Sequence, residues 1–127
     1  SDIITLHLPL FEDTKNLIGE KELAMMKSHA ILINTARGAL VDQKALVDAL
    51  NNGVIGGFGA DVLVVEPPAQ DEPLLSHPKT IITAHVGSLT ATTYKYMCVS
   101  TVKNVLAILS GGSPQPESIF NRKELNL

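Results

Sequence analysis

The sequence predicts an α/β fold with a parallel sheet and a long C-terminal helix. Two observations support this prediction: short apolar runs alternate with segments of helical periodicity, and the links between them are short. Crossovers between parallel strands are right-handed, so we expect helices to pack on the faces of the sheet. The 127 residues suffice for one hydrophobic core, burying roughly two-thirds of the surface that the unfolded chain exposes.

The first half of the chain contains two expected strands and two expected helices. Residues 3–8 and 30–34 are apolar runs, and the second is continuous enough to be buried on both faces of a sheet. Helix formers dominate residues 21–27. Asp42 is expected to cap a second helix, which has apolar residues at i, i+3 and i+4 and Gly53 at its exit.

The second half continues the alternation. Residues 55–62 are expected to form a glycine-rich strand, and glycines weaken a strand unless something passes close to its backbone. Residues 66–78 are proline-rich and are expected to be irregular, and a short strand follows at residues 80–83. A long helix should run from residue 88 or 90 to 109, before two glycines stop it. We therefore expect a domain at residues 1–110 and a polar tail at residues 111–127.

Composition and charge narrow the class of protein. The net charge of −3 provides no basic surface for nucleic acid. Cys98 is the one cysteine, expected to be a small buried residue on the last helix, and it leaves no intrachain disulfide. No apolar run is long enough to cross a bilayer, and the amino end has neither an initiator methionine nor a signal-peptide pattern. We expect a fragment of a cytoplasmic protein with no nucleic-acid or membrane partner and no metal.

Three chemically informative side chains follow apolar runs. Arg37 lies in Asn-Thr-Ala-Arg-Gly, Glu66 in Val-Val-Glu-Pro and His85 in Thr-Ala-His-Val-Gly. In an open parallel sheet these are carboxyl ends of strands, where such folds bind ligands. Taken singly, each has a structural interpretation as a loop arginine, a solvated turn or a packed histidine. Together they predict a site that binds an anionic substrate and moves a proton, as the reduction of a 2-keto acid requires.

The sequence lacks a complete fingerprint for dinucleotide phosphates. The nearest match, Gly57-Phe58-Gly59, opens no helix, and no G-x-x-x-x-G-K-[ST] motif occurs. What is present is typical of the second half of a Rossmann-like, doubly wound dinucleotide-binding domain, the half that meets the nicotinamide.

Several motifs in order resemble one enzyme family. Asn-Thr-Ala-Arg-Gly-Ala-Leu-Val-Asp at residues 34–42, Gly-Val-Ile-Gly-Gly at 53–57, Asp61-Val62 and Glu66-Pro67 are similar to those of the D-isomer-specific 2-hydroxyacid dehydrogenases. The family includes glycerate, phosphoglycerate and D-lactate dehydrogenases and the C-terminal-binding corepressors. The resemblance covers residues 1 to about 109 and leans toward the glycerate dehydrogenase type.

The resemblance implies roles for the three site residues. Arg37 would hold the substrate carboxylate and keto oxygen, and His85 would be the acid/base. Glu66 would pair with the other ring nitrogen of His85, and a neighbouring carboxylate favours the protonated imidazole. One departure is Ala84, where the family usually has proline before the catalytic histidine.

The resemblance also implies a cofactor, NAD or NADP. Asp61 would accept a hydrogen bond from its carboxamide. The other lining residues would be Pro9, Thr14, Thr35, Ala36, Arg37, His85 and Gly87.

Two functions stay open at this point. The first is a fragment of an NAD(P)-dependent enzyme that interconverts D-2-hydroxy acids and 2-keto acids of the glycerate and hydroxypyruvate type. The alternative is a non-catalytic module that senses a dinucleotide, as a corepressor does. In both cases we expect a homo-oligomer, because half of a doubly wound sheet leaves an edge strand and apolar faces open.

Overall fold

The protein is described by a computed structural model that places residues 1–124, in two compact units, Ser1–Gly87 and Ser88–Leu127. The division between the two units falls after Gly87. The long helix α4 (Ala91–Leu109) belongs to the second unit, and none of its residues is buried. Within the predicted tail, residues 125–127 lie outside the described part.

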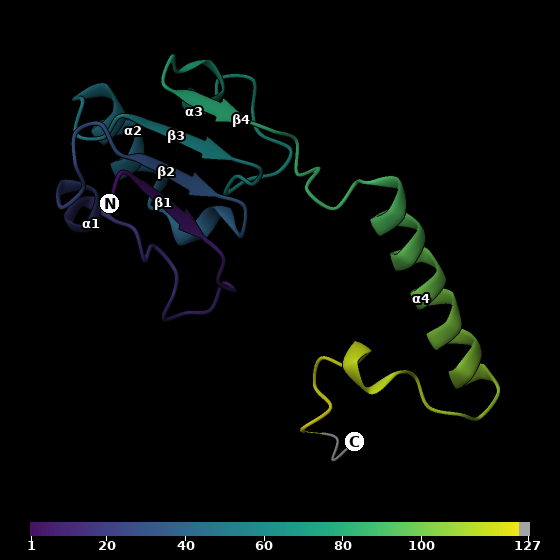
Figure 1. Ribbon diagram of the computed structural model, residues 1–127. Helices are drawn as coiled ribbons and strands as arrows, with labels where there is room; N and C mark the ends of the chain where they lie inside the picture. The colour runs from purple at the N-terminus through teal and green to yellow at the C-terminus, as the bar shows by residue number, and fades with distance from the viewer. Residues whose placement is uncertain (125–127) are drawn as a thin grey trace. The chain divides into compact units, whose positions relative to one another are not determined.

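Four parallel strands form the sheet, in the order β1 (Ile3–Leu6), β2 (Ile31–Asn34), β3 (Gly57–Ala60) and β4 (Thr80–Ile82). Figure 1 shows their arrowheads pointing the same way. The predicted α/β parallel sheet is confirmed. All four carboxyl ends therefore lie along one edge.

Short helices connect the strands. They are α1 (Glu20–Ala24), α2 (Gln43–Asn51) and α3 (Pro73–Ser76), with a 3-10 turn η1 (Gly38–Leu40) before α2 and another, η2 (Pro116–Ser118), in the second unit. Asp42 caps α2 as predicted: its carboxylate accepts a hydrogen bond from the Ala45 amide at 3.0 Å. Gly53 adopts a φ of 68° just after the helix, which is the left-handed conformation that glycine adopts without strain.

The strands are shorter than predicted, and one helix was missed. The first strand ends at Leu6 and not at residue 8, because its partner β2 ends at Asn34, directly opposite Leu6. Residues 66–78 are not irregular throughout, since Pro73 begins α3, where its missing amide hydrogen costs nothing. The Glu72 side chain caps that turn, and Leu74 anchors it in the core.

The sheet is covered on one face. Right-handed crossovers between strands in sequential order place every connecting helix on the same side. Leu32 and Phe58 point to that side and are buried, whereas Ile3, Ile31 and Ile81 are exposed on the other. One-sided cover is what half of a doubly wound sheet presents.

The buried face dominates stability. Leu32 is fully buried, so Leu32→Ala should lower the free energy of unfolding by about 2–5 kcal/mol. Ile81→Ala is the matched control, because Ile81 is 75% exposed and should change that free energy by no more than about 0.5 kcal/mol. Urea unfolding of both variants measures the difference. Equal losses would contradict the one-sided core.

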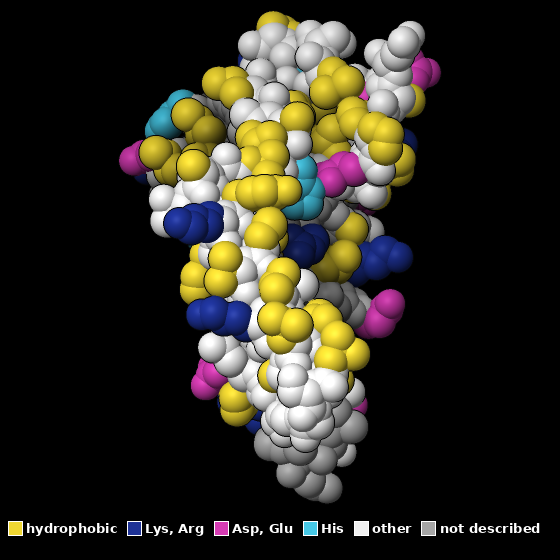
Figure 2. Space-filling view, turned by 90° about the vertical axis from the view of Figure 1, so that its right-hand side faces the viewer, with side chains coloured by type: hydrophobic (Ala, Val, Ile, Leu, Met, Phe, Trp, Pro, Cys, Tyr) yellow, Lys and Arg dark blue, Asp and Glu magenta, His cyan; other side chains and the backbone are white. Residues whose placement is uncertain are grey.

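The second unit is built around α4, which Thr90 caps through the Thr93 amide. Its side chains are largely exposed, and hydrophobic side chains are visible over this side of the molecule in Figure 2. Cys98 is on this helix as predicted, but it is exposed and not buried, because the described residues of the unit do not cover the helix enough to bury any of its side chains. In residues 1–124, no helix combines the length and apolarity needed to cross a membrane.

Candidate active site

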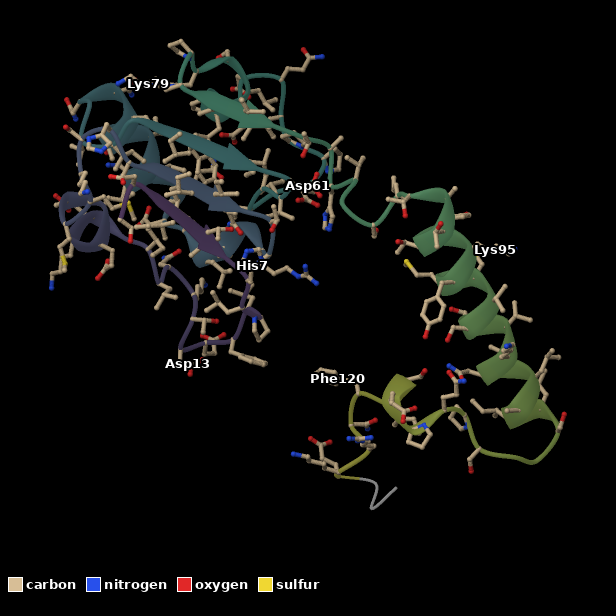
Figure 3. All side chains as sticks on the ribbon, in the orientation of Figure 1. His7, Asp13, Asp61, Lys79, Lys95 and Phe120 are labelled. Atoms are coloured by element: carbon tan, nitrogen blue, oxygen red, sulfur yellow. The ribbon has the colours of Figure 1, made fainter. Side chains whose placement is uncertain are left out.

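The predicted site residues lie beyond the carboxyl ends of the strands. Pro9 and Thr14 lie in the loop after β1, and Thr35 to Arg37 follow β2. Asp61 and Glu66 lie in the loop after β3, and His85 and Gly87 follow β4. Figure 3 shows the labelled His7 and Asp61 at the arrowhead ends of their strands. The parallel sheet thus brings four separate loops to the edge at which the sequence predicted the site.

Glu66 and His85 form the central pair. The Nδ1 atom of His85 lies 2.7 Å from Oε2 of Glu66, and the other carboxylate oxygen accepts a hydrogen bond from the Leu63 amide at 2.8 Å. An ionised carboxylate only accepts, so Nδ1 carries the hydrogen and Nε2 is left to face a reactant. The hydrogen bond from His85, followed by that from Leu63, lowers the pKa of Glu66 below its usual value. Glu66 is therefore kept ionised as the acceptor for Nδ1 of His85.

A mainly apolar cavity adjoins this pair. Its volume is about 270 Å³, and Glu66 and His85 supply polar groups to its wall. The apolar lining residues are Leu63, Pro67, Pro68, Leu75, Ile82 and Ala84. Both side chains of the pair are partly open to solvent, at 51% for His85 and 36% for Glu66, so a reactant can reach them.

Asp61 organises the segment that carries His85. Its carboxylate accepts hydrogen bonds from the Thr83 hydroxyl and from the amides of Val86 at 3.0 Å and Gly87 at 2.8 Å. His85 between them has a φ of 55°, a left-handed conformation that is uncommon for a side-chain-bearing residue. The Asp61 carboxylate thus stabilises the left-handed conformation of His85 and fixes the direction of the imidazole. It does so although Ala84 stands where the family usually has a proline before the histidine.

The Asp61 contacts depend on pH. The hydrogen bond from Thr83, followed by that from Val86, lowers the pKa of Asp61 below its ordinary value of 3.8. A carboxyl whose pKa is lower in the folded state stabilises that state above its unfolded pKa, and the contribution is lost as pH falls through the folded pKa. The Val86 and Gly87 amide resonances should therefore shift in NMR titrations below pH 3.8.

Asp61→Asn tests the same contacts at neutral pH. A side-chain amide has one acceptor oxygen in place of two, so the Val86 and Gly87 amides should lose hydrogen-exchange protection. Asp2→Asn is the control, because Asp2 also has a lowered pKa but lies at the opposite end of β1. Unchanged protection in Asp61→Asn would contradict the proposed organising role.

Arg37 is exposed at the tip of the loop after β2. Its guanidinium donates to the Ala36 carbonyl at 2.7 Å, and in the part of the chain that the structure places it forms no ion pair. The structure does not bring it into hydrogen-bond contact with Glu66 or His85. Its remaining donors are available for an anion.

Asn34 is a residue whose role sequence reasoning missed. It is fully buried, its side-chain amide donates to the Arg37 carbonyl at 2.8 Å, and its side-chain oxygen accepts from the Ala36 amide at 3.0 Å. These two hydrogen bonds fix the backbone of the loop that carries Arg37. The available signal was a polar amide at the end of an otherwise apolar run, where a buried side chain must find partners.

Pro9 and Thr14 lie in the turn after β1. The Thr14 hydroxyl donates to the Pro9 carbonyl at 2.9 Å and accepts from the Phe11 amide at 2.7 Å. Thr14 therefore shapes this turn. Thr35 is exposed and Ala36 is partly buried beyond β2, at the same edge of the sheet.

The edge residues fit the carboxamide end of a nicotinamide cofactor. A carboxylate has about four acceptor positions, and Asp61 uses three for Thr83, Val86 and Gly87. One position is left for an amide donor. Within residues 1–124, no cluster of three or more His, Cys, Asp or Glu side chains is arranged to hold a metal ion.

Comparisons with known proteins agree with this arrangement. Residues 1–87 match the family described as D-isomer specific 2-hydroxyacid dehydrogenase, NAD binding domain. The chain is 48% identical over 113 residues to the glycerate dehydrogenase of Methylorubrum extorquens, covering 87% of this chain and 36% of the relative. It is also 48% identical over 111 residues to the glyoxylate/hydroxypyruvate reductase B of Pectobacterium carotovorum, covering 87% and 35%.

A solved structure shows the same fold. The TT0316 protein from Thermus thermophilus superimposes with a TM-score of 0.85 at 46% identity, over 90% of this chain and 36% of that one. The chain thus spans about a third of the length of the relatives that it matches. With the family match covering the whole sheet and the loops of the site, the chain belongs to the D-isomer specific 2-hydroxyacid dehydrogenase family, as part of its NAD-binding domain.

Proposed function

We propose that this chain supplies the acid/base half of the active site of an NAD(P)-dependent D-2-hydroxyacid dehydrogenase. The observation that supports this proposal most directly is the contact of 2.7 Å between His85 and Glu66 at the carboxyl edge of the sheet. The enzyme would interconvert D-2-hydroxy acids and 2-keto acids of the glycerate and hydroxypyruvate type. The names of the two relatives support this substrate class.

His85 is the proposed acid/base. In reduction, its Nε2 would donate a proton to the keto oxygen, and in oxidation the same nitrogen would take the proton from the hydroxyl. Glu66 holds Nδ1 and so keeps Nε2 directed outward.

Arg37 is the proposed anchor for the substrate. Its planar fork matches the geometry of a carboxylate, and one of its remaining donors would polarise the keto oxygen. The Asn34 side chain bonds both the Ala36 amide and the Arg37 carbonyl, so the backbone that carries the guanidinium is held in place. Anchoring the carboxylate orients the keto carbon for reaction.

The proposed cofactor-lining residues come from the loops at the carboxyl edge of the sheet. They are Pro9, Thr14, Thr35, Ala36, Arg37, Asp61, His85 and Gly87. When bound, the nicotinamide supplies or accepts the hydride. The vacant acceptor position of Asp61 would receive the carboxamide. The choice between NAD and NADP is decided by titrating the full-length protein with each.

The enzyme is favoured over the dinucleotide-sensing alternative, since both relatives are named as enzymes. We further propose a cytoplasmic homo-oligomer. The exposed isoleucines on the uncovered sheet face support association, because apolar surface of this kind is normally buried. We also keep residues 1–110 as the NAD(P)-binding region and residues 111–127 as a tail, to be tested by limited proteolysis.

The proposed reaction is tested with a substrate panel. The full-length protein that carries this chain is assayed with NADH and NADPH against glyoxylate, hydroxypyruvate, pyruvate and longer 2-keto acids. Cofactor oxidation with hydroxypyruvate or glyoxylate, giving the D-isomer where the product is chiral, is the expected result. Nucleotide binding with no turnover on any keto acid would instead support the sensing module.

A further inference from the structure

Gly38 lies against the backbone of the loop that precedes Glu66. A Cβ atom at Gly38 would lie 2.1 Å from the Leu63 carbonyl carbon, 2.3 Å from its oxygen and 2.4 Å from the Val64 nitrogen. Carbon atoms in contact are about 3.5–4.0 Å apart, so one backbone segment would have to move by more than about 1 Å. No side-chain rotation relieves this overlap, since all three atoms belong to the main chain.

The turn that contains Gly38 is anchored from several sides. The Arg37 carbonyl accepts from Asn34, the Ala39 carbonyl accepts from the Asn16 amide at 2.8 Å, and the Leu40 carbonyl accepts from the Ile18 amide at 3.0 Å. The loop opposite is less constrained, because Val64 and Val65 are 48% and 66% exposed. A side chain at Gly38 would therefore displace the Leu63–Val64 peptide and leave η1 in place.

The displaced peptide directly follows the amide that binds Glu66, because the carbonyl that would move and the amide that donates both belong to Leu63. The Leu63 amide donates to Oε1 of Glu66 at 2.8 Å, while Oε2 contacts His85. From these contacts we propose that Gly38 is a positioning residue for the Glu66–His85 pair: its lack of a side chain lets the Leu63 amide reach the carboxylate. The catalytic meaning of this inference rests on the proposed function. The geometric link between the arginine loop and the histidine loop does not.

The charge environment of Glu66 provides a direct readout. His85 and the Leu63 amide lower the pKa of its carboxyl group, whereas partial desolvation and the nearby charge of Asp61 raise it. Loss of the Leu63 hydrogen bond in Gly38→Ala should therefore raise the pKa of Glu66 toward its ordinary value. Carbon-13 NMR titration of the side-chain carboxyl in the 127-residue chain measures this pKa without substrate or cofactor.

Gly59→Ala is the matched control. Gly59 is also a glycine near the sheet edge, but a Cβ atom there would meet nothing within 4 Å. We expect wild type and Gly59→Ala to have the same Glu66 pKa and Gly38→Ala to have a higher one. A folded Gly38→Ala protein with the wild-type pKa at Glu66 would overturn the inference.

A second measurement keeps the inference testable if Gly38→Ala does not fold. In Glu66→Gln, which leaves Gly38 unchanged, the amide resonances of Leu63 and Gly38 should both shift, while that of Gly59 should not. A shift at Leu63 without one at Gly38 would show that the two loops are not coupled. Because neither experiment measures turnover, failure of this inference is distinguishable from failure of the proposed reaction.

Discussion

His85→Ala in the full-length protein is expected to lower the rate of 2-keto acid reduction by roughly 10²-fold or more, through loss of the proton donor. The reason is geometric as well as chemical. His85 bonds Glu66 through Nδ1, and Asp61 bonds the amides of the two residues that follow His85. These contacts fix the orientation of the imidazole, so that Nε2 can face the substrate. Steady-state kinetics with saturating reduced cofactor measure the effect on kcat.

His29→Ala is the matched control for that variant. His29 also pairs with a carboxylate, since its Nε2 lies 2.9 Å from Asp2, but this pair is at the amino end of the strands. We expect its kcat to equal that of wild type. A His85→Ala enzyme with a rate close to wild type would remove the acid/base assignment, and with it the main support for the proposed function.

Arg37→Lys should lower kcat/KM for a 2-keto acid by roughly 10²-fold, about the cost of misplacing a bound reactant. An ammonium is a point charge and does not reproduce the two parallel hydrogen bonds of a guanidinium. The loss should be much smaller for a ketone without a carboxylate, because the fork then has no anion to bind. Comparing the two substrates separates anchoring from a general loss of activity.

The matched control is Arg122→Lys, which changes the other arginine of the chain, in the second unit. It should leave kcat/KM unchanged. Equal kcat/KM values for Arg37→Lys and wild type would show that another residue binds the carboxylate. The assignments of Arg37 and His85 therefore fail independently of each other.

Much of the site was predictable because its residues mark the ends of strands. Apolar runs followed by Arg37 and His85 predict strand ends close to those places, and parallel strands bring such ends to one edge. Glu66 was expected to follow a strand in the same way, but it lies in the loop after β3, which ends at Ala60. The cap at Asp42 and the glycine exit of α2 were predictable for the same reason, since both depend on residues a few positions apart. Helix capping and the backbone preference of glycine depend on residues that are close together in the sequence, so a sequence pattern predicts them directly.

The sequence by itself determined the α/β class, the alternation of strands and helices and the edge at which the candidate site forms. The tertiary structure decided which of those edge residues touch. Three contacts join residues that are 19 to 26 positions apart in the sequence. They are the hydrogen bond between Glu66 and His85, the hydrogen bonds from the amides after His85 to Asp61, and the close approach of Leu63 to Gly38. Such contacts depend on strand register and loop path, because an error of one residue in register moves a side chain to the other face of the sheet.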